Sequence, residues 1–302
     1  MALTTYAFAK SVALTDYMPP FRQAKEQVTW PWEKIVTKKK TNRATEQVFS
    51  YTGLPAANQT GELEPIYYAD AAELDATTFT VTKKTLATMF SHEFIQDSWH
   101  LPDVMADAGK MAGESQAYIR DLAVAAILYG AFDTTITYEG ASTYLCDSHT
   151  MKNGGTYDND LGPSSITFDN LWLMINHFET APVTHQGLYL KDTPKYLIYH
   201  PSKEKEVRAV LKSQLEPNTA NNDKNTVLDY NLIPIPCRFL TTSTHWFIAG
   251  SRFKNDFCFF EREGVKTAME DDFDRMGVKF RSYQRFAVGV RDFLWIVGNP
   301  GA

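Results

Sequence analysis

The sequence predicts an α+β fold with a sizeable core. Three observations lead to this prediction: a long helical pattern at residues 103–129, a helix–strand–helix unit at 168–212, and a β-rich C-terminal part. The 302 residues are 44% hydrophobic and 22% charged, which is the composition of an ordinary globular protein. A chain of this length can form one large domain or two modest ones.

The first 33 residues predict an N-terminal arm with little regular structure. Prolines stand beside large apolar groups in residues 18–21 and 30–32, and proline favours extended backbone. Exposed aromatic surface costs about 25 cal/mol per Å², so Trp30 and Trp32 are expected to be covered. The covering surface is either the body of the same chain or a neighbouring copy.

Residues 34–78 predict a long hairpin with strands at 46–52 and 65–69. The stretch between them holds two glycines and two prolines, which indicates an exposed loop tip with almost nothing to bury. The hairpin is polarised in charge, with basic residues at its start and acidic residues on its return. The basic residues are Lys34, Lys38, Lys39, Lys40 and Arg43, and the acidic ones are Glu62, Glu64, Asp70, Glu73 and Asp75.

The middle of the chain predicts a strand at 77–82, a short helix at 91–99 and the long helix at 103–129. Apolar residues recur every three or four positions along the long helix, and Gly130 is a suitable stop. At 1.5 Å per residue the helix is about 40 Å long, and we interpret its apolar face as core.

The second half predicts helices at 168–179 and 201–212, a strand at 195–200 and a polar loop at 217–226. Five further strands are predicted, at 238–242, 244–249, 257–262, 279–290 and 293–297. Between two of these strands lies MEDDFDRMG, which predicts an acidic hairpin or loop.

Composition excludes several classes of protein. A net charge of −6 argues against a protein that coats nucleic acid, and three distant cysteines argue against a disulfide framework or a structural zinc site. The longest apolar run, residues 122–129, is far shorter than the roughly 20 residues needed to span a bilayer. The N-terminus has no signal-peptide pattern.

No convergent catalytic set is visible in the sequence. Residues 92–96 read HEFIQ, in which Gln96 replaces the second histidine of a zinc-protease motif. Cys146 and His149 lie three residues apart on a loop, which does not by itself make a nucleophilic dyad. We therefore predict no catalytic, cofactor-binding or metal residues and no cofactor. The chain instead offers segments that need neighbours, and this favours self-assembly.

The order of several short motifs resembles that of a known family. Residues 91–98 are similar to an S-x-E-x-x-x-D-S lead, and residues 128–130 to an L-x-G helix end. The other matching positions are Lys83, Cys146 to His149, Leu161 to Leu171, Gly187, Leu188, Pro194 to Leu197, Pro201, Trp246, Phe247, Arg285, Arg291 and Asp292. Together they resemble the major capsid proteins of tailed bacteriophages with the Hong Kong 97-type fold, and most closely the Mu-like major head subunit group.

The resemblance implies a domain plan and a function. Residues 1–33 would be the N-terminal arm and 34–78 the E-loop, residues 79–165 and 252–292 a peripheral domain with spine helix 103–129, and residues 166–251 and 293–302 an axial domain. The chain would be a structural major head protein that forms pentamers and hexamers, building an icosahedral shell around double-stranded DNA in the virion.

The resemblance also implies partners and contact residues. Assembly would take place in the bacterial host cytoplasm with a separate scaffolding protein, a portal and decoration proteins, because only about 30 residues precede the E-loop. No membrane or sequence-specific DNA contact is expected, and the loop tip has Asn58 but no lysine for a Lys–Asn cross-link. The expected subunit-interface residues are Trp30, Trp32, Lys38, Lys39, Lys40, Arg43, Glu270, Asp271, Asp272 and Asp274.

Two alternatives stay open at this stage. An encapsulin-type nanocompartment shell protein would share the same fold and would enclose a cargo enzyme. A metal-dependent hydrolase would need scattered residues such as His149, His177 and His185 to gather in a cleft.

Overall fold

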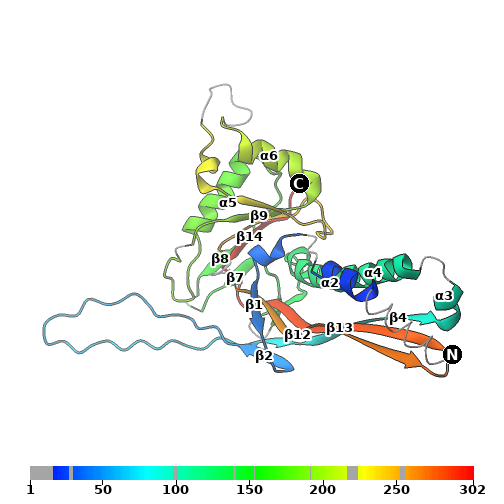
Figure 1. Cartoon of the computed structure of the whole chain (residues 1–302). Helices are drawn as coiled ribbons and strands as arrows, with labels where there is room; N and C mark the ends of the chain where they lie inside the picture. The colour runs from blue at the N-terminus through cyan, green and yellow to red at the C-terminus, as the bar shows by residue number, and fades with distance from the viewer. Residues whose placement is uncertain are drawn as a thin grey trace.

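Two four-stranded sheets organise the chain, and a long loop projects from one of them (Figure 1). The computed structural model describes residues 16–26, 30–97, 101–138, 141–152, 154–190, 192–215, 224–251 and 256–302. The first sheet has the strand order β1-β12-β13-β4 and the second β10-β9-β11-β14. Helices pack on both sheets, so the predicted α+β class is confirmed.

The first sheet is built on a long antiparallel hairpin. Its strands are β1 (Thr37–Lys40), β4 (Thr82–Ser91), β12 (Phe257–Asp272) and β13 (Gly277–Val290). β1 pairs with β12 in parallel, and the other neighbours are antiparallel. Alternate residues of β13, Phe280, Ser282 and Gln284, are buried on one face, whereas Lys279 and Arg281 are exposed on the other.

Helix α4 (Leu101–Tyr129) covers the buried face of this sheet and confirms the predicted long helix. Gln284 Nε2 donates to the Gln116 carbonyl on α4 at 2.7 Å, and Gln116 Nε2 donates to Ser282 Oγ at 3.0 Å. Helix α3 (His92–Asp97) follows β4 and lies within the predicted helix 91–99, whose last two residues lie outside the described part.

Helix α2 (Met18–Ala24) packs closely on α4 and corrects the prediction of an extended arm. Its two prolines occupy the first helical turn, where a missing N–H costs nothing. Gly109 and Gly113 of α4 permit the close approach, because a Cβ on Gly113 would lie 2.6 Å from the Phe21 carbonyl oxygen and one on Gly109 even nearer to that of Tyr17. Residues 1–15 of the predicted arm lie outside the described residues.

The second sheet is buried on both faces, except at one edge strand whose two prolines are exposed. Its strands are β9 (Tyr196–Tyr199), β10 (Ile233–Pro236), β11 (Trp246–Ala249) and β14 (Ile296–Asn299). Helices α5 (Phe168–Thr180) and α6 (Glu204–Lys212) pack on one face through residues such as Phe178 and Val207. Phe247 and Ile296 on the opposite face share a core with Leu128 of α4. This core therefore joins the two sheets.

Short elements complete the fold. They are the ribbon β5–β6 (Ile136–Tyr138 and Ala141–Thr143), the ribbon β7–β8 (Ser148–Thr150 and Thr156–Asp158), and the 3-10 turns η2 (Trp32–Lys34), η3 (Pro201–Lys203) and η4 (Thr226–Tyr230).

The predicted strand at 238–242 is wrong, and β10 forms a few residues earlier. Pro234 and Pro236 lack backbone N–H groups. They are tolerated because β10 is an edge strand, where an N–H group on the outer side has no partner strand. Strand β4 also continues nine residues beyond the predicted end at residue 82. Most of the predicted loop 217–226 lies outside the described residues.

The projecting loop, defined here as residues 49–76, leaves the body through the ribbon of β2 (Thr45–Val48) and β3 (Thr77–Thr80). Figure 1 shows it as the long pale-blue trace pointing away from both sheets. Near its root, Tyr51 bridges to Glu73, and the Leu74 N–H donates to the Ser50 carbonyl at 2.8 Å. The exposed tip confirms the prediction of a loop there, but the predicted strand at 65–69 does not form.

Candidate assembly surfaces

The basic cluster, defined as Lys38, Lys39, Lys40 and Arg43, lies on β1 and in the turn after it. All four side chains are exposed. Lys38 forms an ion pair with Glu33 and lies 4.8 Å from the centroid of the Trp32 ring, and Lys39 lies 5.7 Å from the Phe260 ring. In the part of the chain that the structure describes, Lys40 and Arg43 form no ion pair within 4 Å, so both can take part in a contact with another molecule.

Trp30 and Trp32 do not lie on the surface, which corrects their predicted place at a subunit interface. They are only 2% and 1% exposed and belong to the core that joins the sheets. Trp32 Nε1 donates to Asp121 Oδ1 of α4 at 2.7 Å, and Trp30 Nε1 donates to the Asp121 carbonyl at 3.4 Å. The body of the same chain therefore covers these two tryptophan rings of the arm.

The acidic hairpin tip comprises Glu270, Asp271 and Asp272 at the end of β12 and Asp274 in the following turn. Lys279 donates a hydrogen bond to Asp272, and this bond lowers the pKa of the Asp272 carboxyl. In the β1–β12 register, Lys38 lies beside Phe259, eleven residues from Glu270. At 3.3 Å per residue the basic cluster and the acidic hairpin tip are roughly 36 Å apart. The chain does not bring them together by itself.

The projecting loop carries large apolar side chains that the sequence interpretation overlooked. Its exposed side chains include Leu63 at 101%, Tyr68 at 86%, Ile66 at 71% and Tyr67 at 63%. The sequence does indicate these exposed apolar residues, because they interrupt a stretch that is otherwise rich in turn-forming residues. Clustered exposed apolar groups mark an interaction surface.

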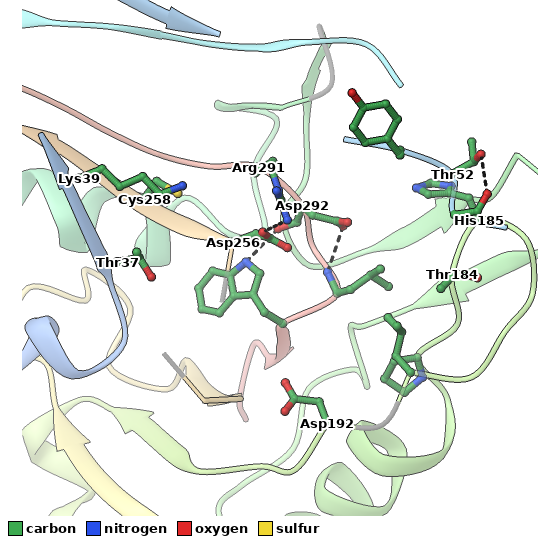
Figure 2. A pocket seen from close by; sticks show the side chains of 16 residues that line it. Thr37, Lys39, Thr52, Thr184, His185, Asp192, Asp256, Cys258, Arg291 and Asp292 are labelled. Atoms are coloured by element: carbon green, nitrogen blue, oxygen red, sulfur yellow. Dashed lines mark hydrogen bonds and ion pairs between the residues drawn. The ribbon is translucent and has the colours of Figure 1, made fainter. Parts of the chain in front are cut away.

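A cavity of about 650 Å³ opens at the root of the loop, between the end of the first sheet and residues 182–190 with Asp192 (Figure 2). Arg291 forms an ion pair with Asp256 inside it. Burial nevertheless raises the pKa of Asp256 to about 6, despite the opposing effect of Arg291. Burial also raises the pKa of Asp292, whose carboxylate accepts the Phe293 and Leu294 N–H groups at 2.6 and 3.3 Å.

The Cys258 thiol in this cavity is not activated as a nucleophile. Burial raises the pKa of the Cys258 thiol, although nearby Lys39 opposes the change. Figure 2 places Lys39 and Cys258 on one side of the cavity and Thr52, Thr184 and His185 on the other. A thiol that holds its proton is a poor nucleophile.

Aromatic rings contact each of the three histidines of the hydrolase hypothesis. His149 stacks on Phe293 at 3.8 Å between centroids, and His185 meets the same ring edge-on. His177 stacks on Tyr157 instead. Tyr138 Oη and Asn159 Oδ1 occupy the two His149 ring nitrogens, at 2.9 and 3.1 Å, and burial lowers its pKa. Among the described residues, no group of three or more histidine, cysteine or acidic residues is placed to hold a metal ion.

Comparison with known proteins decides the family. The family model of the phage capsid protein matches residues 74–299, which is well over half of the chain. The chain belongs to the phage capsid protein family. It is therefore a structural protein of the phage shell and a component of the virion. The Mu-like group within this family stays a prediction.

Solved structures share the fold of the capsid chain. The capsid of the cyanophage P-SCSP1u is similar with a TM-score of 0.63 at 10% identity, covering 91% of this chain and 89% of that one. A protein of Mycobacterium phage Adephagia gives a TM-score of 0.56 at 14% identity, covering 89% and 88%. These likenesses confirm the Hong Kong 97-type fold expected from the motifs.

The encapsulin alternative is less well supported. A virus-like particle from Pyrococcus furiosus has a TM-score of 0.50 at 10% identity, covering 93% of the capsid chain and 96% of its own. The family model and the phage structures favour the phage shell over this alternative. No curated protein sequence matches the chain. None of the described helices combines the length and apolar character needed to cross a membrane.

Proposed function

We propose that the capsid chain assembles as pentamers and hexamers into an icosahedral shell that encloses double-stranded phage DNA. The observation that carries this proposal is the projecting loop, which exposes large apolar side chains away from its own body. Fully burying one such side chain contributes about 1.5–3 kcal/mol. A neighbouring copy that covered Leu63, Ile66, Tyr67 and Tyr68 would supply that burial repeatedly around a ring.

A head-to-tail contact suits this geometry. The loop and the body surface that would receive it are different patches of one chain, and such heterologous contacts close into rings when the rotation between copies allows. We also propose the domain plan given by the sequence, with residues 79–165 and 252–292 as the peripheral domain and residues 166–251 and 293–302 as the axial domain. The peripheral domain then holds β4, β12, β13 and α4, the axial domain holds the second sheet with α5 and α6, and β1 falls within the E-loop 34–78.

The net negative charge of the chain is consistent with a shell that encloses DNA without binding it tightly. The net charge of −6 disfavours tight phosphate binding, so we propose enclosure without sequence-specific contact. The proposal includes assembly in the host cytoplasm with a separate scaffolding protein, portal and decoration proteins, and no enzymatic activity.

The basic cluster and the acidic hairpin tip are proposed to meet between neighbours. Lys40 and Arg43 on one copy would face Glu270 and Asp274 on the next, because these exposed groups lie too far apart within one chain. Solvent-exposed pairs contribute about 0–1 kcal/mol each, so they would guide register more than they stabilise the shell.

The test is a variant in which a short Gly-Ser linker replaces residues 54–72, compared with the parent chain. Both are co-expressed with the neighbouring genes and examined by sedimentation and negative-stain microscopy. We expect closed shells from the parent and folded subunits without shells from the variant. Normal shells from the variant would refute the role of the loop, and particles filled with a protein cargo instead of DNA would favour the nanocompartment.

A further inference from the structure

Residues 291–295 link the first sheet to the second, and we name them the crossing segment. Strand β13 of the first sheet ends at Val290, and β14 of the second sheet begins at Ile296. The Phe293 side chain of the crossing segment is only 2% exposed and belongs to the core that joins the sheets. The contacts that hold Phe293 in place therefore help to hold the two sheets together.

Two polar side chains bind the crossing segment from the ribbon β7–β8 and the residue after it. His149, in the middle of β7, stacks on the Phe293 ring at 3.8 Å between centroids and 12° between planes. Asn159, directly after β8, donates from Nδ2 to the carbonyls of Phe293 and Ile296 at 3.3 and 3.1 Å. Asn159 Oδ1 also lies 3.1 Å from His149 Nε2. His149 is thus held against the crossing segment both directly and through Asn159.

The hydrogen-bond partners of Asn159 fix the hydrogen on one nitrogen of His149. Asn159 Nδ2 donates to the Leu145 carbonyl as well as to the two carbonyls of the crossing segment and β14, and Oδ1 accepts the Asp147 N–H at 2.8 Å. Turning the amide over would set its oxygen against three carbonyl oxygens, so these partners assign its orientation. Because Asn159 Oδ1 can only accept, His149 Nε2 carries a hydrogen and donates it.

The second ring nitrogen, Nδ1, has a partner that can either donate or accept. Tyr138 Oη lies 2.9 Å from His149 Nδ1 and 3.0 Å from the Tyr144 carbonyl oxygen. A hydroxyl has one hydrogen, so it donates to only one of these two groups at a time. When His149 is neutral, the hydroxyl donates to Nδ1. When His149 is protonated, Nδ1–H donates to Oη and the hydroxyl turns to the Tyr144 carbonyl, so the Tyr138 oxygen supports the charged ring.

Burial decides which form of His149 the folded chain holds near neutral pH. The ring is only 7% exposed, and burial is the largest cause that lowers its pKa from the ordinary value of 6.5. Hydrogen bonds with Asn159 and the Leu145 carbonyl, and the carboxylates of Asp147 and Asp158, oppose this change. The buried ring is therefore neutral at neutral pH, and it takes up a proton from solvent only in acid.

The other titratable groups of this core surround the same phenylalanine. Burial raises the pKa of the Cys146 thiol and of the Tyr157 hydroxyl, so both keep their protons. The Asp292 carboxylate accepts the Phe293 N–H. His185 meets the Phe293 ring edge-on, and burial together with nearby Lys152 lowers the pKa of this histidine as well. His185 is therefore the competing site for a proton, and the test separates the two histidines.

We propose that His149 is an acid-sensitive latch, whose neutral ring holds the crossing segment in the core and whose protonated ring releases it. A ring that leaves the core is solvated and binds a proton more tightly than the buried ring, so acid shifts the population toward the released form. Release removes the stack on Phe293 and the contact with Asn159, and the joint between the two sheets then opens. This inference goes beyond the proposed function, because it concerns one folded chain and needs no shell.

Hydrogen exchange of the full-length chain tests the latch. Peptides that cover the crossing segment are followed by mass spectrometry from about pH 8 to about pH 5, a range that spans the titration of an exposed histidine. The rates are corrected for the intrinsic pH dependence of amide exchange. We expect opening of the crossing segment to increase about tenfold over this range, whereas peptides from the middle of α4 should show no comparable increase.

His149→Gln is the deciding variant, because glutamine keeps an N–H group for Asn159 Oδ1 but takes up no proton. Opening of its crossing segment should not change with pH. His200→Gln is the matched control, since His200 is half-buried after β9 and lies 2.8 Å from Ser202 Oγ, measured from its Nδ1. This control and His185→Gln should both keep the increase that the parent shows.

Tyr138→Phe tests the hydrogen-bond part of the argument and retains His149. It removes the oxygen that accepts from the protonated ring, so the buried ring binds a proton more weakly still. The difference in proton affinity between the released and the buried ring then grows. We therefore expect a larger increase in opening between neutral pH and about pH 5 than in the parent. A purely structural role of Tyr138 would raise opening equally at every pH.

Each outcome decides the proposal. A parent chain without the increase, an increase that persists in His149→Gln, or one that disappears in His185→Gln would overturn it. If His149→Gln does not fold, the parent, His185→Gln and Tyr138→Phe decide in its place, and an unchanged increase in Tyr138→Phe would then count against the latch. The result is separate from assembly: a chain that builds no shells can still show the latch, and a chain that builds shells without this pH response lacks it.

Discussion

Replacing Gly109 by alanine tests the docking of the N-terminal helix on α4. An alanine Cβ would press on the backbone carbonyl of Tyr17, which cannot move without shifting α2. Overpacking of this kind costs about 1–3 kcal/mol, whereas alanine in place of glycine inside a helix contributes about 1 kcal/mol of stability. We therefore expect a net loss of up to about 2 kcal/mol in the free energy of unfolding.

The sign of the change is the informative result. If α2 did not pack on α4, only the gain in helix propensity would remain, and the variant would be more stable than its parent. The assay is urea unfolding of the free subunit, combined with the rate of trypsin cleavage at exposed Arg22. We expect faster cleavage in the variant, because a displaced α2 also loses the hydrogen bond from Arg120 to the Lys25 carbonyl.

Ser115→Ala is the matched control, since Ser115 is exposed on the same helix and the change alters only helix propensity. A Gly109→Ala chain that gained stability as Ser115→Ala does, with unchanged cleavage at Arg22, would refute the docked position of α2.

Two further predictions concern buried polar groups. Asn159→Ala should cost about 2–4 kcal/mol in urea unfolding, because the Asn159 amide donates to the Leu145 and Ile296 carbonyls at 2.9 and 3.1 Å and accepts the Asp147 N–H at 2.8 Å; a cost below 1 kcal/mol would contradict this. Asp256→Asn should gain stability relative to the parent as the pH rises. The Asp256 pKa lies near 6 in the folded chain and near 3.8 when unfolded, so the folded parent binds more protons in that window and loses stability as the pH rises through it. The difference should grow by up to about 3 kcal/mol between pH 4 and 7, and a constant difference would argue against the raised pKa.

Elements with strong local patterns were predictable. The apolar spacing of residues 103–129 gave α4 to within two residues of its start, and Gly130 marked its end. Helix α5 and the acidic turn between β12 and β13 were also recognised, because capping groups and turn residues act over a few positions.

Features set by distant contacts were not predictable. β1 pairs with a strand more than 200 residues later, and nothing within residues 37–40 indicates that partner. The sequence predicts that Trp30 and Trp32 are covered, but not whether the same chain or a neighbour covers them. Their cover is a core of residues distant in sequence, with Asp121 accepting the Trp32 indole N–H. The strand pattern predicts that Lys279 and Arg281 share a face, but only the register of β13 with its neighbours places Lys83 and Lys266 on that face as well.

The ribbon that carries the projecting loop continues into both outer strands of the first sheet. β1 precedes β2 and β4 follows β3, and these two strands form opposite edges of the order β1-β12-β13-β4. A sideways pull on the loop is thus shared by two edges, with the hairpin of β12 and β13 held between them. Because the loop is connected to both edge strands, a force that a neighbouring subunit exerts on it is transmitted to both edges of the first sheet and would twist that sheet as a unit.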